Sequence, residues 1–160
     1  MKMITAARRN VYIQTPYFVP DASILESLKM ASLAGVDVRV MIPCKPDHMF
    51  VYWATYAYVG ELLSSGARVF IYDNGFLHAK TMVVDGEVAS IGSANFDMRS
   101  FKLNFEANAI IYDAAEAYKI EAIFENDMAC CRELTKALYR KRSPVIKFKE
   151  SVSRLLSDLL

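Results

Sequence analysis

Residues 76–106 read FLHAKTMVVDGEVASIGSANFDMRSFKLNFE, and this stretch carries the strongest indications of both fold and chemistry. At its centre, Asp85 and Gly86 form a pair that is typical of a two-residue β-hairpin turn. The flanking runs, 79–84 and 87–91, are rich in valine and other apolar residues that favour strands. We therefore predict two antiparallel strands joined at this turn.

Strands and helices are predicted to alternate along the rest of the chain. Apolar residues recur at helical spacing in some segments and gather in short β-branched runs in others. The expected strands are residues 11–15, 36–42, 67–72 and 105–112, and the expected helices are residues 21–34, 46–65, 114–138 and 147–160. This alternation predicts one α/β domain over residues 1–160, a layered sandwich with a mixed β-sheet flanked by helices.

Composition limits the classes of function that are compatible with this chain. Of the 160 residues, 54% are hydrophobic, and 19 Lys+Arg against 18 Asp+Glu leave a net charge of +1. Disordered chains are poorer in apolar residues, and domains that hold nucleic acid by bulk electrostatics are usually strongly basic. We therefore expect no nucleic-acid partner. The three cysteines lack metal-ligand spacing, so neither a metal nor another cofactor is expected.

The side chains of the central stretch follow the pattern H-x-K-x4-D-x6-G-S-x-N, from His78 to Asn95. On a strand, residues two apart point to the same face, so His78 and Lys80 are expected to project together. The same spacing brings Ser93 and Asn95 together if the chain is extended there. These four side chains form a site for a tetrahedral anion, in which His78 can act as nucleophile and the other three can hold phosphate oxygens.

Two carboxylates complete the predicted site. A nucleophilic histidine needs a partner on its other ring nitrogen, and Glu106 is the best candidate for pairing with His78. Asp85 belongs to the same pattern and is counted with the catalytic set. Its position at the turn nevertheless favours a structural brace over a group that takes part in the chemistry.

The pattern from His78 to Asn95 resembles the signature of the phospholipase D superfamily. Its six defined positions make it specific, with odds on the order of 10⁻⁸ per starting point at average residue usage. The resemblance implies a phospholipase D-like fold and a phosphohistidine intermediate on His78, which an acceptor alcohol or water then resolves. It also implies that Lys80 and Asn95 bind phosphate, that Ser93 matches the family's serine, that Glu106 pairs with the histidine, and that no metal is required.

Further segments are similar to the second half of bacterial superfamily members that make cardiolipin. These segments are YIQTPYFVPD at 12–21, PDH at 46–48 leading to YWA at 52–54, FDMRSF at 96–101 and LL at 155–156. The similarity implies a phosphatidyltransferase that joins two phosphatidylglycerol molecules and releases glycerol. It also implies contact with an anionic phospholipid membrane, which is the cell membrane for the full-length enzyme.

Family members use two such motifs, with one histidine as nucleophile and the other as general acid, whereas this chain has one motif. The other histidine, His48, is not followed by a lysine two residues on. We therefore expect a second motif-bearing half, either upstream in the same chain or in a second copy. The membrane-spanning segments usual at the N-terminus of such enzymes are also missing. The chain is thus expected to be a fragment or a half, cytoplasmic or peripheral.

Several residues outside the motif leave alternatives open. His48 and Tyr17 could line a substrate pocket, although His48 could equally cap and pack at the start of a helix. The helix expected at 147–160 is amphipathic and could lie on a membrane or dock onto the domain. The 9 Phe, 9 Tyr, 1 Trp and 8 Met residues form a large apolar surplus. This surplus predicts an exposed interaction face or lipid entrance to which residues 50–59 contribute.

Two other functions remain compatible with the sequence. A homodimeric phosphodiesterase, phospholipase or nuclease would use the same motif, although the near-neutral charge disfavours a DNA substrate. A half without a second motif could also be inactive and serve only in assembly with a partner.

Overall fold

The computed structural model describes residues 1–45 and 48–157. Within them the chain forms a sheet of seven strands in the order β8-β6-β5-β1-β3-β4-β9 and a separate pair, β2-β7. The strands are β1 (Asn10–Gln14), β2 (Phe18–Val19), β3 (Asp37–Pro43), β4 (Arg68–Tyr72), β5 (Thr81–Val84), β6 (Val88–Gly92), β7 (Phe96–Asp97), β8 (Asn108–Ile111) and β9 (Cys131–Glu133). The helices are α1 (Lys2–Ala6), α2 (Ala22–Leu33), α3 (Met49–Ser65), α4 (Met98–Lys102), α5 (Ala114–Met128), α6 (Lys136–Arg140) and α7 (Pro144–Leu155).

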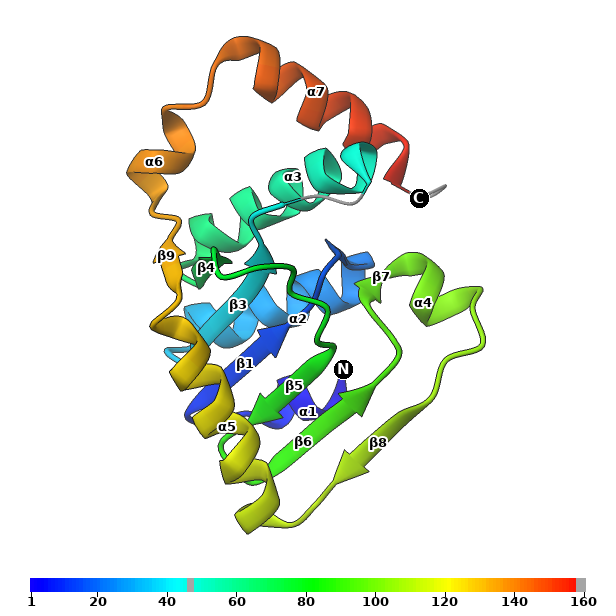
Figure 1. Cartoon of the computed structure of the whole chain (residues 1–160), viewed down its shortest axis with the longest axis vertical. Helices are drawn as coiled ribbons and strands as arrows, with labels where there is room; N and C mark the ends of the chain where they lie inside the picture. Colours follow the sequence, from blue (N-terminus) through cyan, green and yellow to red (C-terminus); the bar gives the residue numbers. More distant parts are fainter. Residues whose placement is uncertain (46–47, 158–160) are drawn as a thin grey trace.

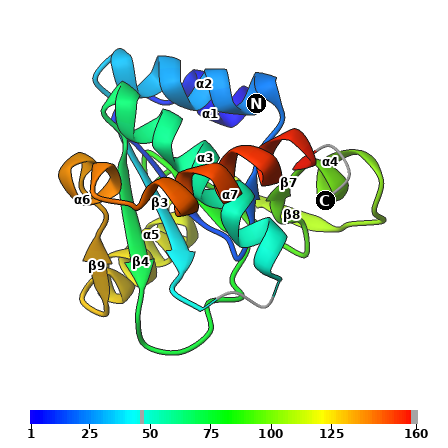
Figure 2. The ribbon, with the colours of Figure 1, turned by 90° about the horizontal axis from the view of Figure 1, so that it is seen from above.

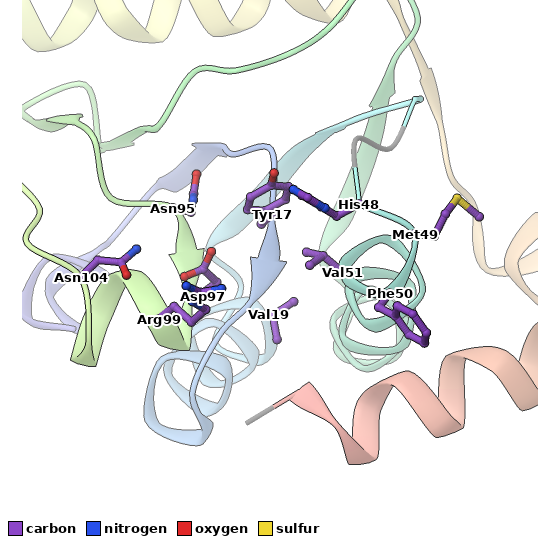
Figure 3. A pocket seen from close by; sticks show the side chains of 10 residues that line it. All are labelled: Tyr17, Val19, His48, Met49, Phe50, Val51, Asn95, Asp97, Arg99 and Asn104. Atoms are coloured by element: carbon purple, nitrogen blue, oxygen red, sulfur yellow. The ribbon is translucent and has the colours of Figure 1, made fainter. Parts of the chain in front are cut away.

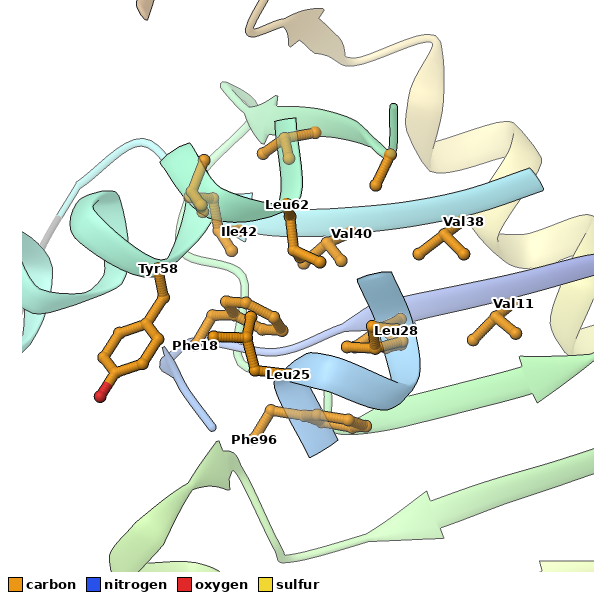
Figure 4. Packing of buried hydrophobic residues seen from close by; sticks show 14 of the residues in the cluster. Val11, Phe18, Leu25, Leu28, Val38, Val40, Ile42, Tyr58, Leu62 and Phe96 are labelled. Carbon is orange, nitrogen blue, oxygen red and sulfur yellow. The ribbon is translucent and has the colours of Figure 1, made fainter. Parts of the chain in front are cut away.

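Helices cover both faces of the large sheet (Figures 1 and 2). Residues of β1 alternate between these faces, as expected for a strand. Val11 and Ile13 belong to the core shared with α2 and α3, part of which is drawn in Figure 4. Tyr12 points the other way and stacks on Phe124 of α5, with ring centroids 4.8 Å apart. Strands β1, β3 and β4 are parallel and their outer neighbours antiparallel, which confirms the predicted α/β sandwich with a mixed sheet.

The predicted hairpin at the centre of the motif is confirmed. Strands β5 and β6 pair antiparallel, with Val84 opposite Val88. Asp85 and Gly86 between them have φ angles of 56° and 63°. Asp and Gly adopt positive φ at low cost, and the backbone N–H of Glu87 donates to the Val84 carbonyl at 3.0 Å to close the turn. Because β6 pairs only from Val88, three residues separate the paired strands, one more than predicted.

The prediction of one long helix over residues 114–138 is wrong, because helix α5 ends at Met128. Residues of β9 instead pair antiparallel with β4 at the edge of the sheet, with Phe70 opposite Glu133. Glu133 accepts two hydrogen bonds from the Arg68 guanidinium, at 2.9 and 2.8 Å, and Leu134 is buried. The free edge of β4 therefore overrides the helical tendency of this segment.

Other boundaries differ by a few residues. Strand β5 begins only at Thr81, and β8 is confined to 108–111 within the expected 105–112. Helix α7 begins at Pro144, earlier than expected, because the Ser143 hydroxyl accepts from the backbone N–H of Ile146 at 3.3 Å and caps it. The expected helix start at 46–47 and the last residues of the 147–160 helix lie outside the described residues.

The aromatic helix α3 is only partly buried. Its inner side, which includes Ala54, Tyr58 and Val59, packs toward the sheet, while Phe50 remains 59% exposed. Helix α7 crosses over the outer side of α3 (Figure 2). The apolar surplus in this segment therefore serves the core in part and leaves an exposed rim at the start of the helix. No helix within the described ranges is both long enough and apolar enough to cross a bilayer.

Candidate functional site

The β5–β6 hairpin and strand β1 bring motif residues to one end of the sheet. The backbone N–H of Gly92 donates to the Lys80 carbonyl at 3.2 Å, so the start of β5 lies beside the end of β6. Thr81 lies opposite Gln14, and its hydroxyl donates to the Gln14 side-chain oxygen at 3.0 Å. The buried amide of Gln14 in turn donates to Asp127 of α5 at 2.7 Å. These contacts hold the motif end of the sheet in place.

Close contact between β6 and β8 explains why glycine stands at position 92. A Cβ atom there would overlap the carbonyl oxygen of Ala107 and would lie 2.6 Å from the Cα of Asn108. The next residue, Ser93, donates its backbone N–H to the Ala107 carbonyl at 3.0 Å. The glycine therefore allows the backbone before Ser93 to approach β8 closely, because no Cβ atom stands between them.

Replacing Gly92 with alanine is expected to lower the free energy of unfolding by about 2 kcal/mol, because backbone atoms of β8 must move aside. Urea unfolding followed by circular dichroism measures the change. The control is Gly35→Ala, where φ is 93° but no atom lies within 4 Å of the added Cβ. In that control only backbone strain lowers the free energy of unfolding, by about 1 kcal/mol. An equal cost for both variants would contradict a steric role for position 92.

Glu106 is the centre of a hydrogen-bond network at this end of the sheet. Ser93 donates its hydroxyl to one carboxylate oxygen, while Asn104 and Ser100 donate to the other at 3.1 and 3.3 Å. In the structure the hydrogen bonds to this carboxylate come from serine and asparagine donors, and the pairing of Glu106 with His78 stays a prediction. The loop after α4 directs the carboxylate toward the end of β6.

The same network keeps Glu106 ionised. The hydrogen bond from Ser93 makes the largest contribution, followed by that from Asn104, and both lower the pKa of the carboxyl group below its usual value. Ser100 and the positive charge of Lys80 lower the pKa further. Lys80 also donates to the carbonyl oxygen of His78 at 3.0 Å. The Glu106 carboxylate is thus hydrogen-bonded to the Ser93 hydroxyl and interacts electrostatically with the Lys80 ammonium.

His78 lies just before β5 rather than on it, which corrects the expectation that a strand directs its side chain. The ring is exposed and stacks on Phe76, with centroids 5.5 Å apart and an interplanar angle of 26°. Within residues 1–45 and 48–157, no side chain is hydrogen-bonded to its imidazole. Both ring nitrogens are therefore accessible to a substrate or to another protein segment.

A cavity of about 350 Å³ opens beside Asn95 (Figure 3). One side is apolar and the other polar, and the lining residues are Tyr17, Val19, His48, Met49, Phe50, Val51, Asn95, Asp97, Arg99 and Asn104. The side-chain oxygen of Asn95 is buried and has no hydrogen-bond partner among the described residues. A buried acceptor without a partner requires an explanation, and a ligand donor in this cavity would supply one.

Of the predicted site residues, Tyr17, His48 and Asn95 line this cavity, and the ring centroids of Tyr17 and His48 are 6.4 Å apart. Their positions agree with the expectation that Tyr17 and His48 line a pocket. His78 and Lys80 are not among the lining residues. The predicted set is thus divided between the cavity and the surface beside it.

Asp85 lies at the opposite end of β5 from His78. The Asp85 carboxylate accepts hydrogen bonds from the backbone N–H groups of Arg8, Arg9 and Asn10 at 2.9, 2.7 and 2.9 Å. These contacts favour the expected brace between the hairpin turn and the start of β1, and the inclusion of Asp85 in the catalytic set stays a prediction.

Two residues of the site, Ser100 and Asn104, were not predicted from the sequence. Ser100 accepts a hydrogen bond from the backbone of Asn95 at 3.1 Å, in addition to its bond with Glu106. Its position depends on α4, which is capped by the Asp97 carboxylate accepting from the Ser100 N–H at 2.7 Å. An aspartate three residues before a serine is a helix-start signal that could have predicted this turn.

The site combines an exposed imidazole, an ammonium, two serine hydroxyls, an ionised carboxylate and a cavity with an unpartnered amide oxygen. These groups suit nucleophilic attack at a phosphorus atom and hydrogen bonding to its oxygens. In the part of the chain that the structure describes, no group of three or more His, Cys, Asp or Glu side chains could hold a metal ion.

Comparisons with known proteins identify the family of the chain. The family described as "Cardiolipin synthase, PLD-like domain" matches residues 1–128. Over all 160 residues, the chain is 62% identical to a cardiolipin synthase of Listeria monocytogenes and 58% identical to the major cardiolipin synthase of Bacillus subtilis. The chain spans about a third of the length of these relatives, 33% in each case.

A solved structure shows the same fold. Nuc from Salmonella typhimurium, a phospholipase D family member, matches with a TM-score of 0.73 and 21% sequence identity. The match covers 84% of this chain and 88% of that chain. The predicted phospholipase D-like fold is therefore confirmed.

Proposed function

The chain belongs to the phospholipase D-like domain family of cardiolipin synthases, and from this premise we propose that it supplies one catalytic half of a phosphatidyltransferase. The reaction joins two phosphatidylglycerol molecules into cardiolipin and releases glycerol. The observation that carries the proposal is the clustering of Lys80, Ser93 and Glu106 at one end of the sheet, beside the exposed ring of His78.

In the first step, an imidazole nitrogen of His78 attacks the phosphorus of one phosphatidylglycerol. A P–N bond forms and the P–O bond to the head-group glycerol breaks, leaving a phosphatidyl-histidine. The departing glycerol oxygen takes a proton from a general acid on a second half of the enzyme. Lys80 and Asn95 hold the phosphate oxygens and offset the charge that develops on them.

In the second step, a head-group hydroxyl of another phosphatidylglycerol attacks the same phosphorus. Its proton returns to the group on the second half, the P–N bond breaks, and cardiolipin leaves with His78 restored. Glu106 remains ionised throughout and orients Ser93. Glu106 can stabilise the imidazolium of His78 only if binding of substrate or partner releases some of these hydrogen bonds and lets its carboxylate turn toward His78.

The cavity beside Asn95 is assigned to the phosphatidylglycerol head group and the first part of its acyl chains. Asn95 and Arg99 provide polar groups for the head group on one side, and Val51 and Phe50 provide an apolar wall on the other. Tyr17 and His48 close the cavity between these two sides (Figure 3). A site that is half polar and half apolar matches a substrate with the same division.

We assign the general acid to a second motif-bearing half, in another copy of the chain or in another segment of a longer one. The only other histidine in the sequence, His48, lacks the lysine two residues on. The enzyme is placed at the cell membrane, because its substrates are membrane lipids.

Replacing Lys80 with methionine is expected to lower the rate of phosphatidyl transfer by about 10²–10³-fold, since an ammonium that offsets phosphate charge is lost. The assay follows cardiolipin and glycerol released from phosphatidylglycerol vesicles, with the second motif-bearing half present. The matched control is Lys119→Met on α5, where the lysine forms an exposed ion pair with Glu116. Equal rates for both variants would contradict the assignment of Lys80.

The same preparations, supplied with DNA instead of vesicles, test the alternative nuclease. Cleavage of DNA without formation of cardiolipin would show that the substrate is a nucleic acid rather than phosphatidylglycerol. The proposed role of His78 as nucleophile would be unaffected. Formation of cardiolipin without DNA cleavage supports phosphatidyl transfer.

A further inference from the structure

Helix α7 carries its apolar side chains on the outside of the molecule. Val145 is 64% exposed, Phe148 69%, Val152 37% and Leu155 84%. Their spacing of three and four residues places them along one face of the helix. Figures 1 and 2 show α7 lying over α3 at the periphery of the fold. The exposed stripe is therefore a face that the described residues do not cover.

The opposite face of α7 is polar and holds the helix on the domain. Glu150 is buried and accepts hydrogen bonds from the Arg142 guanidinium at 2.7 and 2.6 Å. The hydroxyls of Tyr58 and Ser157 are hydrogen-bonded at 2.9 Å. Rolling α7 over to bury its apolar stripe would expose or break these contacts, and a buried charge that loses its partner is costly.

Two further contacts fix the same orientation. The Arg154 guanidinium forms an ion pair with Glu61 of α3. The Lys149 ammonium lies 5.4 Å from the ring centre of Trp53, also on α3. The side chains that face the domain thus hold α7 with its apolar side outward.

Two lysines flank the apolar stripe unequally. At 100° per residue, Lys149 lies about 40° from one edge of the stripe with its ammonium over Trp53, and the exposed Lys147 lies about 80° beyond the other edge. Residues 140–157 carry six basic side chains and one acidic side chain, a net charge of +5, whereas the whole chain carries +1. The remainder of the chain therefore carries −4. The net positive charge of the molecule therefore comes from α7 and the residues just before it, where Arg142 and Arg154 are paired with Glu150 and Glu61.

We propose that α7 lies in the surface of an anionic phospholipid membrane, with Val145, Phe148, Val152 and Leu155 inserted and the ammonium of Lys147 at the lipid phosphates. An exposed apolar stripe on a helix rich in basic residues is the pattern of helices that lie in the membrane interface. Lysine stems can extend along the acyl boundary while the ammonium groups reach the phosphates. A protein partner fits less well, because the cores of protein interfaces are depleted in lysine.

Contact between α7 and a membrane would affect how lipid reaches the cavity beside Asn95. It does not depend on the proposed phosphatidyl transfer. Helix α7 packs on α3. The first turn of α3 carries Met49 and Phe50, which are 54% and 59% exposed and line the cavity. A membrane bound by α7 would bring lipid to the helix that borders the cavity entrance.

Flotation of the 160-residue chain with vesicles tests the proposal. Wild-type protein is expected to float with vesicles of equal parts phosphatidylglycerol and phosphatidylcholine, and to float poorly with phosphatidylcholine alone. The double variant Phe148→Ser, Leu155→Ser is expected to lower the vesicle partition coefficient by about 30-fold. The matched control is Tyr118→Ser, Ile123→Ser on α5, where both side chains are also exposed and partition should not change.

A second variant tests the charges separately. Lys147→Gln is expected to lower partition into the phosphatidylglycerol vesicles by about fivefold, with no change for phosphatidylcholine vesicles. His78→Ala should float as the wild type does, so failure of this proposal and failure of the proposed reaction are separate results. Circular dichroism and thermal unfolding confirm that each variant is folded.

Three results would overturn the proposal. The first is unchanged flotation of the Phe148→Ser, Leu155→Ser variant, and the second is equal binding to both vesicle types. The third is absence of vesicle binding together with a concentration-dependent dimer, detected by sedimentation, that the same variant dissociates. That last result would assign the stripe to a second copy of the chain.

Discussion

Replacing His78 with alanine will abolish phosphatidyl transfer, with the rate falling by about 10⁴-fold or more, as for other enzymes that lose a covalent nucleophile. Without the imidazole nitrogen no covalent intermediate can form, and the head group of one phosphatidylglycerol must be displaced directly by the other. The measurement is release of glycerol and formation of cardiolipin in the enzyme assembled from this chain and a second motif-bearing half. Radiolabelled lipid phosphate should be trapped on the wild-type protein and not on the variant.

The design separates chemistry from stability. His78 is exposed and makes one ring contact, with Phe76, so the variant should unfold at the same denaturant concentration as the wild type. Added imidazole should restore part of the transfer, because the vacated position is open to solvent. Full transfer activity in a correctly folded His78→Ala enzyme would rule out His78 as the nucleophile.

Replacing Asp85 with alanine is expected to lower the free energy of unfolding by about 3–5 kcal/mol. Three backbone donors, those of Arg8, Arg9 and Asn10, lose their acceptor, and buried or half-buried donors without partners cost about 1–3 kcal/mol each. Alanine also tolerates the φ of 56° at this position less well than aspartate does. Urea unfolding measures the loss, and Asp85→Asn, which keeps one acceptor oxygen, should lose less.

The control is Asp113→Ala, which removes a single hydrogen bond, to the backbone N–H of Glu116 at the start of α5. Loss of one exposed cap costs about 1 kcal/mol. Where the Asp85→Ala protein is still folded, its transfer rate per folded molecule should match the wild type. A variant that unfolds normally and yet loses transfer would instead return Asp85 to the catalytic set.

The stabilisation by Asp85 should depend on pH. Burial disfavours the charged carboxylate, but the backbone donors of Asn10, Arg9 and Arg8 and the charge of Arg9 outweigh it, so the pKa of Asp85 is lower in the folded protein than its ordinary value. A lowered carboxyl pKa stabilises the fold fully above the unfolded value, about 3.9, and this stabilisation is lost as the pH falls through the folded pKa. The difference in stability between wild type and Asp85→Ala should therefore shrink in acid.

Local patterns were sufficient to predict much of the fold. The hairpin between β5 and β6 follows from Asp85 and Gly86 and the apolar runs beside them, because turn chemistry and strand propensity act within a few residues. The mixed sheet and its flanking helices follow from the alternation of apolar periods. The motif residues from His78 to Asn95 were also identifiable, because each position is defined by its spacing along the chain.

Long-range contacts decided the features that local patterns left open or predicted wrongly. Cys131–Glu133 forms a strand only because β4 offers an unpaired edge and Arg68 a partner for Glu133. The carboxylate of Glu106 faces Ser93 rather than His78, because β8 brings the preceding loop against the end of β6. The outward apolar face of α7 depends on the buried pair of Arg142 and Glu150.

The sequence by itself therefore predicted the hairpin, the α/β class and the candidate phosphate-binding side chains. All of these depend on the order and spacing of residues that are close to one another in the chain. Only the tertiary structure decided which of those side chains touch, which backbone groups Asp85 binds, that the cavity lies beside Asn95, and which face of α7 is exposed. Each of these depends on which distant segments meet, and on which buried donors and acceptors become paired when they do.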